Sequence, residues 1–307
     1  MDDWLYPALR FAHYALLLGL FGLTAFRAIG LKWLDREAAR PIERAVVAAA
    51  LAAPFVTLAQ MLASMAAMMG QGIAELEWVT VAALLSDTSL GWAFLARFTL
   101  LIGAAAMLLL GTGSPLARRG AALLYALTLA TLAWSGHAAA TEGAAGTFHR
   151  LSDAAHLIAA GLWIGAIIWF LFLTAKAHRP AGRGLAGPLL SAMHRFAGLG
   201  LLLVAIVVST GAANAQLIFG LANSGAVLHT AYGRLLAAKL ALAGLMLSFA
   251  ARNALIGRRY AKAVDGLGTE TSPTLAALRK SLRVELAVGI SIIAIVALMT
   301  IMSPMGD

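Results

Sequence analysis

Residues 155–175 read AHLIAAGLWIGAIIWFLFLTA, a run without a single Asp, Glu, Lys or Arg. A run of about 20 apolar residues is long enough for a helix to cross the hydrocarbon core of a bilayer. Comparable runs recur along the whole chain, which is 61% hydrophobic and only 12% charged. Soluble domains carry about twice that share of charge. The sequence therefore predicts an integral membrane protein.

The apolar runs predict one all-α domain over residues 1–307, a polytopic membrane bundle of about eight transmembrane helices. The links between the runs are short, and the longest covers about 252–280. Asp2 and Asp3 at the start, and the length of the first run, favour a first span over a cleaved signal peptide. The expected spans are 7–31, 45–70, 91–111, 117–137, 150–175, 194–219, 231–256 and 281–303.

Basic residues are distributed unequally between the two sets of links. Most of the 23 lysines and arginines fall in the links after the first, third, fifth and seventh spans. Lys and Arg accumulate on the cytoplasmic side of membrane proteins. We therefore expect both termini on the non-cytoplasmic side, which in a bacterium is the periplasm.

Several functional classes have no support in the sequence. The net charge of +9 resides in links, where it orients the chain, so we do not expect a nucleic-acid partner. The chain has no cysteine, which excludes disulfides and thiolate metal sites. Nucleotide-binding, nucleophile-elbow and HExxH motifs are missing, so we do not expect an enzyme.

The link before the fifth span, SGHAAATEGAAGTFHRLSDAAHL at 135–157, concentrates candidate metal ligands. His149, Asp153 and His156 are spaced i, i+4, i+7 and share one helical face, and His137 ends the preceding run. Imidazole with carboxylate suits Zn, Cu, Fe or Ni. The alternative is that these histidines are solvated at a membrane surface.

A stripe of methionines lies at the outer end of the second span. Met61, Met65 and Met68 follow the same i, i+4, i+7 spacing. Thioether sulfur selects Cu(I) over hard cations, although methionine also fills gaps between packed helices. His13 lies in the first span at a similar depth, where an ionisable group is a functional candidate.

Other residues inside the spans predict packing and pairing. Arg97, Arg234 and Lys239 need partners in the membrane, and Asp87 and Asp153 are the nearest acids in the expected topology. Gly161 and Gly165 form a small-xxx-small face for close helix contact, and Glu285 beside Arg283 is expected at an interface.

Four stretches together resemble the CopD (PcoD) family of bacterial copper-resistance membrane proteins. They are WSGHA at 134–138, HLIAAGLWIGA at 156–166, MHRFAGLGLLLVAIVVSTGAANA at 193–215 and YGRLLAAKLALAGLMLSFAARNAL at 232–255. The resemblance implies a multi-pass protein of the bacterial inner membrane that takes part in copper uptake. It also implies a periplasmic CopC-like copper-binding protein as partner. His137 and His156 fall within the matching motifs.

The leading hypothesis is a copper-binding membrane transporter for Cu(I), Cu(II) or both, which serves copper homeostasis and resistance. Its candidate ligands are His13, His137, His149, His156, Asp153, Met61, Met65 and Met68. Two alternatives remain open. One is a redox protein with b-type haem between paired histidines such as His13 and His156. The other is a copper sensor or delivery factor that moves no ion across the membrane.

Overall fold

The computed structural model describes residues 4–264, 271–299 and 302, and every regular element in this part of the chain is helical. The predicted all-α fold class is confirmed. The side chains of residues 137, 140, 181, 183, 258–264 and 271–272 fall outside the description. The α-helices are α1 (Leu5–Ile29), α2 (Arg36–Met69), α3 (Trp78–Asp87), α4 (Ser89–Leu110), α5 (Pro115–Ala130), α6 (Gly143–Ala177), α7 (Ala186–Ile218), α8 (Ser224–Leu228), α9 (Ala231–Val264) and α10 (Thr271–Met299). Short 3₁₀ segments join them: η1 (Ile73–Glu75), η2 (Thr131–Trp134), η3 (His137–Ala140), η4 (Pro180–Leu185) and η5 (Leu221–Asn223).

Seven helices in the described residues are long and apolar enough to cross a membrane, namely α1, α2, α4, α6, α7, α9 and α10. The eighth expected span corresponds to α5, which has 16 residues and is continued by the 4 residues of η2. At about 1.5 Å per α-helical and 2.0 Å per 3₁₀ residue, the two segments together extend about 32 Å. They therefore also reach the thickness of a hydrocarbon core, about 30 Å.

Several helices extend beyond the expected spans. α2 begins nine positions before residue 45, and α9 and α10 continue into the predicted link 252–280, which is mostly helical. Hydropathy marks where apolar sequence ends, whereas a helix continues until its backbone hydrogen bonds stop. Asp35 caps the start of α2 by accepting a hydrogen bond from the Ala38 N–H.

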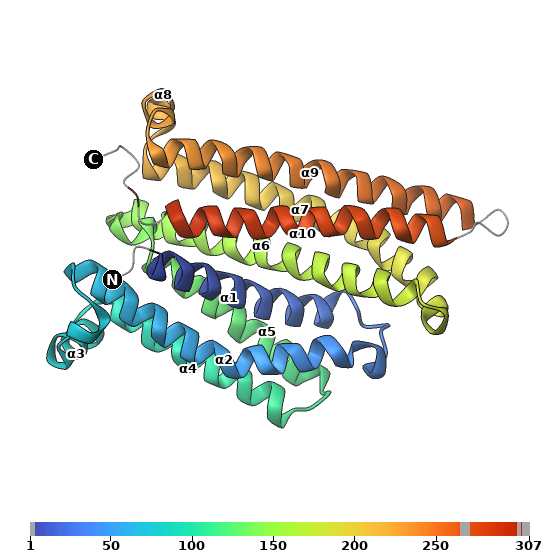
Figure 1. Cartoon of the computed structure of the whole chain (residues 1–307), viewed down its shortest axis with the longest axis horizontal. Helices are drawn as coiled ribbons and strands as arrows, with labels where there is room; N and C mark the ends of the chain where they lie inside the picture. Colours follow the sequence, from blue (N-terminus) through green and yellow to red (C-terminus); the bar gives the residue numbers. More distant parts are fainter. Residues whose placement is uncertain (1–3, 265–270, 300–301, 303–307) are drawn as a thin grey trace.

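The bundle has two groups of helices that follow the order of the chain (Figure 1). The N-terminal group is α1, α2, α4 and α5, and the C-terminal group is α6, α7, α9 and α10. Helices α1 and α6 form the main contact between the groups. There, a Cβ added to Gly22 would lie 2.0 Å from the carbonyl oxygen of Gly161 and 2.8 Å from the backbone nitrogen of Gly165. The predicted small-residue contact face at Gly161 and Gly165 is confirmed, because only glycine allows this approach.

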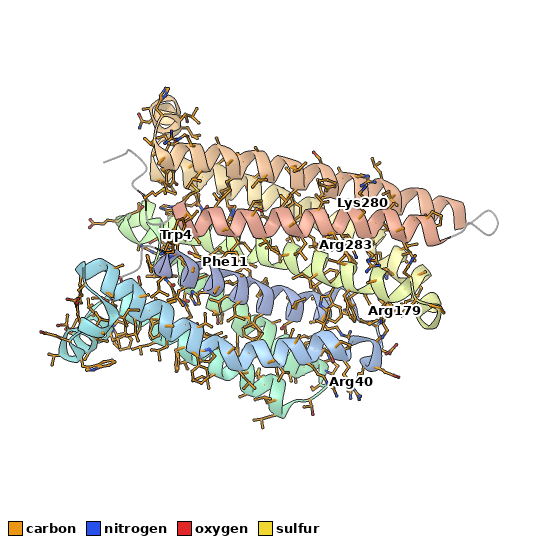
Figure 2. The ribbon with its side chains drawn as sticks, viewed as in Figure 1. Trp4, Phe11, Arg40, Arg179, Lys280 and Arg283 are labelled. Carbon is orange, nitrogen blue, oxygen red and sulfur yellow. The ribbon has the colours of Figure 1, made fainter. Side chains whose placement is uncertain are left out.

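The start of α1 and the end of α10 lie at the same end of the bundle, as an even number of crossings requires (Figure 1). Arg40, Arg179 and Lys280 lie toward the opposite end from Trp4 (Figure 2). The labelled basic residues therefore lie at the opposite end of the bundle from the start of α1, as expected (Figure 2). We call the end with Trp4 the outer end and the basic end the inner end.

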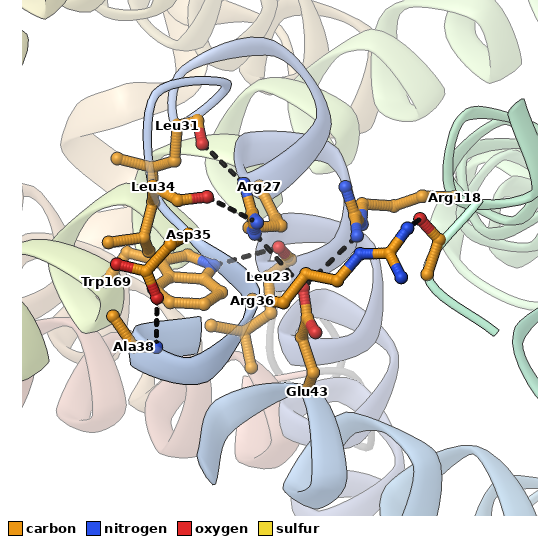
Figure 3. Close-up of polar contacts among 11 residues, drawn as sticks. Leu23, Arg27, Leu31, Leu34, Asp35, Arg36, Ala38, Glu43, Arg118 and Trp169 are labelled. Carbon is orange, nitrogen blue, oxygen red and sulfur yellow. Dashed lines mark hydrogen bonds and ion pairs between the residues drawn. The ribbon is translucent and has the colours of Figure 1, made fainter. Parts of the chain in front are cut away.

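Polar contacts fix the inner end of the N-terminal group (Figure 3). Oε1 of Glu43 on α2 accepts hydrogen bonds from Arg27 of α1 at 3.1 Å and Arg118 of α5 at 3.2 Å. Arg27 also donates to the carbonyl oxygens of Leu31 and Leu34. These contacts tie three helices together at the inner end and so help to hold their outer ends in register.

Candidate metal centre

A cavity of about 40 Å³ lies toward the outer end of the N-terminal group. It is bounded by α1, α2, α4 and the η2 segment, and three of the predicted metal ligands line it: His13, Met61 and Met65. A site of this volume has room for a few water-sized particles. Residues from four separate parts of the sequence thus meet in one place.

His13 is buried on α1 and faces α2. Its Nε2 lies 3.1 Å from Oγ1 of Thr57, which is also buried. Thr57 and Met61 are one helical turn apart on α2, so the same face carries the histidine's partner and the first methionine. Metal-binding histidines commonly donate the N–H of their second ring nitrogen to a hydrogen-bond acceptor. The Thr57 hydroxyl can accept such a bond.

The methionine stripe divides into two parts. Met61 and Met65 are buried and also pack with Val81 and Phe94 in a small hydrophobic cluster. Met68 lies in the last turn of α2, before the left-handed Gly70, and is 65% exposed. The structure therefore brings two of the three predicted methionines to the cavity with His13, and leaves Met68 outside the cavity lining.

Two buried arginines, Arg10 and Arg97, line the same cavity. Arg97 donates from Nε to Oγ1 of Thr131 at 2.8 Å and from Nη2 to the Thr131 carbonyl at 3.0 Å. Arg10 donates to the hydroxyl of Tyr6 at 2.8 Å and to the carbonyl of Ser135. Among the described residues neither arginine has a carboxylate partner, because both ion pairs found there use Glu43. The expectation that Asp87 or Asp153 pairs with Arg97 is therefore wrong.

The same arginines hold the start of the link at 135–142. Ser135 accepts hydrogen bonds from both, through its carbonyl from Arg10 and through Oγ from Arg97. Arg150 on α6 donates to the carbonyls of Ala138 and Thr141, and its guanidinium lies over the ring of Trp134. Three arginines thus hold the first part of this link in place.

A second polar cluster lies in the C-terminal group, between α6, α7 and α9. Nδ1 of His156 lies 3.0 Å from Oγ1 of Thr210. Nδ2 of Asn214 donates to Asp153 at 3.3 Å, and Asp153 interacts electrostatically with Lys239. Asp153 therefore supplies an opposite charge near Lys239, as expected, but the two side chains form no direct ion pair among the described residues. Asp153 and His156 share one face of α6, as their spacing predicted, and that face contacts α7.

His149 belongs to neither cluster. It is buried, and its Nδ1 lies 2.9 Å from Oγ1 of Thr141, in the link that precedes α6. His137 begins η3, but its side chain lies outside the described residues. No three His, Asp or Glu side chains in the described part of the chain come close enough together to hold a metal ion. A joint site of His137, His149, Asp153 and His156 therefore stays a prediction.

The haem alternative required two histidines from different helices across one cofactor. His13 faces Thr57 of α2, whereas His156 faces Thr210 of α7. The two histidines named for this role thus have partners in different helix groups. This arrangement does not favour the binding of one haem iron by both histidines.

Glu285 on α10 is a buried polar residue. It is 2% exposed and accepts hydrogen bonds from Nε1 of Trp163 at 3.1 Å and Nδ2 of Asn253 at 2.9 Å. The expected interfacial position is wrong. The sequence does carry a sign of this burial. The helical spacing assigns Glu285 to the same face of α10 as Leu278 and Leu282, and all three are buried.

Comparison with known proteins gives consistent matches along the chain. Residues 1–147 match the family described as "Copper resistance protein D-like, N-terminal domain", and residues 190–299 match "Copper resistance protein D". Copper resistance protein D of Pseudomonas syringae pv. tomato is 31% identical, with 99% of this chain and 98% of that protein covered. No solved structure gives a significant match.

Two further relatives are more distant. Inner membrane protein YebZ of Escherichia coli (strain K12) is 29% identical over 80% of this chain and 82% of that protein. Copper transport protein CutJ of Bacillus subtilis (strain 168) is 28% identical over 55% of this chain and 27% of that protein. The helical bundle and these matches together define a copper-associated, multi-pass protein of the inner membrane. The chain belongs to the copper resistance protein D family.

Proposed function

We propose that this protein binds copper at the periplasmic side of the inner membrane and passes it inward, for uptake into the cytoplasm. The observation that carries the proposal is the convergence of His13, Met61 and Met65 on one cavity toward the outer end. One imidazole and two thioethers form a soft ligand set that suits Cu(I) better than hard divalent cations.

The hydrogen bond of His13 supports a role as a ligand. If Nε2 donates to Thr57, the lone pair of the neutral ring is on Nδ1 and is free for a metal. Thr57 then fixes the ring orientation, as partners of metal-bound histidines commonly do.

The outer link supplies the proposed point of entry. His137 lies two positions after Ser135, which the cavity arginines hold, and Asp153, His149 and His156 follow on α6. Histidine and carboxylate suit copper that arrives as Cu(II). We expect the double variant His137→Ala/His156→Ala to reduce copper stoichiometry without unfolding the bundle. Unchanged copper binding in that variant would remove the entry role from the link.

A periplasmic CopC-like copper-binding protein is the proposed partner, on the basis of the family resemblance. The outer end would receive copper from it. Co-purification of such a protein with the full chain in detergent, in the presence of copper, tests this part. Loss of the complex on copper removal is the expected result.

The main test is anaerobic Cu(I) loading of the purified protein in detergent, followed by metal analysis. We expect about one copper tightly held at the cavity, and at least about tenfold weaker binding in Met61→Leu/Met65→Leu. Leucine conserves the volume of methionine, so the double variant removes sulfur with little effect on packing. Met68→Leu is the matched control, since Met68 is exposed at the end of the same helix. Equal copper binding in the double variant and the control would contradict the site.

Copper flux is tested separately. We expect vesicles with the wild-type protein to accumulate Cu(I) from the outer side faster than vesicles with the double methionine variant. Copper binding without accumulation would favour the alternative of a sensor or delivery factor.

A further inference from the structure

The cavity that holds His13, Met61 and Met65 carries positive charge on its own wall. Arg10 and Arg97 both line it, and both are more than nine-tenths buried. They interact electrostatically with each other and with His13. Buried charges are costly unless an opposite charge accompanies them.

The partners found for the two arginines are neutral. They are the hydroxyls of Tyr6, Tyr14, Thr131 and Ser135 and the carbonyls of Thr131 and Ser135. The guanidinium of Arg10 also lies 5.7 Å from the ring centroid of Tyr14. These dipoles and the ring face solvate the charges in part, but none of them supplies a negative charge.

Hydrogen-bonding capacity also remains unused around the cavity. Nε of Arg10 is buried without a hydrogen-bond partner among the described residues. Oε1 of the cavity residue Gln60 is likewise buried without a partner, and rotation of that amide would exchange this acceptor for two donors. The cavity wall therefore offers spare donors in addition to two positive charges.

We propose that this cavity binds a small monovalent anion, for which chloride is the probe, between Arg10 and Arg97. The volume of about 40 Å³ has room for about three water-sized particles, which suits a halide better than a larger oxyanion. The unpartnered donors and the two uncompensated charges are what an anion would satisfy.

The bound anion also affects copper binding, and this part of the inference rests on the proposed function. A bare Cu(I) ion beside His13 would add a third positive charge to the cavity. A monovalent anion bound between the arginines offsets one of these three charges, so copper and the anion together add no net charge to the cavity. Copper binding to the cavity then depends on the anion in solution, whereas anion binding does not require copper.

The first measurement uses copper-free, full-length protein in detergent and sodium gluconate buffer. Radiolabelled chloride is added and binding is followed by equilibrium dialysis. We expect about one chloride per chain, and at least about tenfold weaker binding in Arg10→Gln and in Arg97→Gln. Arg150→Gln is the matched control, since Arg150 also binds carbonyls of the outer link but does not line the cavity. If the glutamine variants do not fold, Arg10→Lys replaces them in the chloride measurement. This variant keeps the positive charge but loses most of the hydrogen-bond donors.

The second measurement compares Cu(I) affinity in chloride and in gluconate, with free Cu(I) fixed by a competing chelator. We expect at least about tenfold tighter copper binding in chloride for the wild type, and no difference for Arg97→Gln. Chloride binding without copper binding in either buffer would contradict the proposed function and leave the anion site supported. Copper binding without any bound chloride would overturn the anion site and leave the copper site standing.

Two further results would also overturn the anion site. One is an equal loss of chloride in Arg150→Gln, since that variant leaves the cavity unchanged. The other concerns Asp2 and Asp3, which precede Arg10 in the sequence and lie outside the described residues. Chloride that binds to Asp2→Asn/Asp3→Asn but not to the wild type would identify those carboxylates as the native counter-charges.

Discussion

The two helix groups each contain a polar cluster on the outer part of the bundle, and the clusters differ in how their charges are compensated. In the C-terminal group, Lys239 has Asp153 as its counter-charge, and Asp153 also accepts a hydrogen bond from Asn214. In the N-terminal group, Arg10 and Arg97 carry like charges with neutral partners only, beside a cavity.

The difference indicates a division of roles. Where opposite charges lie within one cluster, no ligand is needed to compensate them. A cavity with uncompensated charges and spare hydrogen-bond donors needs a ligand to satisfy them, and its sulfur atoms can bind a soft metal. The N-terminal group is therefore the better candidate for ligand binding. The C-terminal cluster holds α6, α7 and α9 together, and its Asp153 and His156 are the proposed ligands at the point of entry.

The largest expected effect comes from the contact that joins the two groups. Gly22→Ala would place a methyl group 2.0 Å from the Gly161 carbonyl oxygen, so α1 and α6 must separate. We expect a loss of about 3 kcal/mol in the free energy of unfolding, because overpacked contacts of this kind force backbone shifts. Gly19→Ala is the control, since an added Cβ there has no neighbour within 4 Å. Thermal unfolding in detergent compares the two, and similar transitions would contradict the close contact.

The next effect concerns Glu285. Glu285→Ala leaves Trp163 Nε1 and Asn253 Nδ2 buried without an acceptor, at an expected cost of about 2 to 3 kcal/mol in unfolding free energy. Glu285→Gln should cost much less. The Asn253 amide can rotate, so that its unpartnered Oδ1 accepts from the new amide group. Equal destabilisation of the two variants would indicate that the negative charge itself, rather than hydrogen bonding, is required.

A smaller effect is expected at the compensated pair of the C-terminal group. Asp153→Asn removes an opposite charge near Lys239, and we expect a loss of about 1 to 2 kcal/mol, because the two side chains interact without a direct ion pair among the described residues. Asp153→Asn/Lys239→Met should recover most of this loss. A double variant as unstable as the sum of its single variants would show that the two charges do not interact.

The smallest expected effect sharpens the description of the metal centre. Thr57→Val removes the partner of His13 Nε2 while the volume of the side chain is kept. We expect copper affinity to fall by about tenfold, at the lower end of what such partners contribute, with the stoichiometry unchanged. Competition with a Cu(I) chelator measures the change. An unchanged affinity would exclude the proposed orientation of the imidazole.

Local periodicity in the sequence predicted much of the fold and part of the site. The spacing of Met61 and Met65, of Asp153 and His156, and of Gly161 and Gly165 correctly placed each pair on one helical face. Such pairs are decided within one helix, where three or four positions make a turn.

The features that were missed depend on contacts between helices. Met68 follows the stripe but is exposed in the last turn of α2, and His149 turns to Thr141 instead of joining His156. The neutral partners of Arg97 come from η2, about 34 positions away in the sequence. Hydropathy does not reveal which neighbour faces a given helical face, so these contacts required the structure.

The most direct test of the central claim is X-ray absorption spectroscopy at the copper edge of the Cu(I)-loaded protein. We expect sulfur and imidazole scattering from one site, with the sulfur contribution lost in Met61→Leu/Met65→Leu and retained in Met68→Leu. Copper surrounded only by nitrogen and oxygen, or sulfur scattering that persists in the double methionine variant, would contradict it.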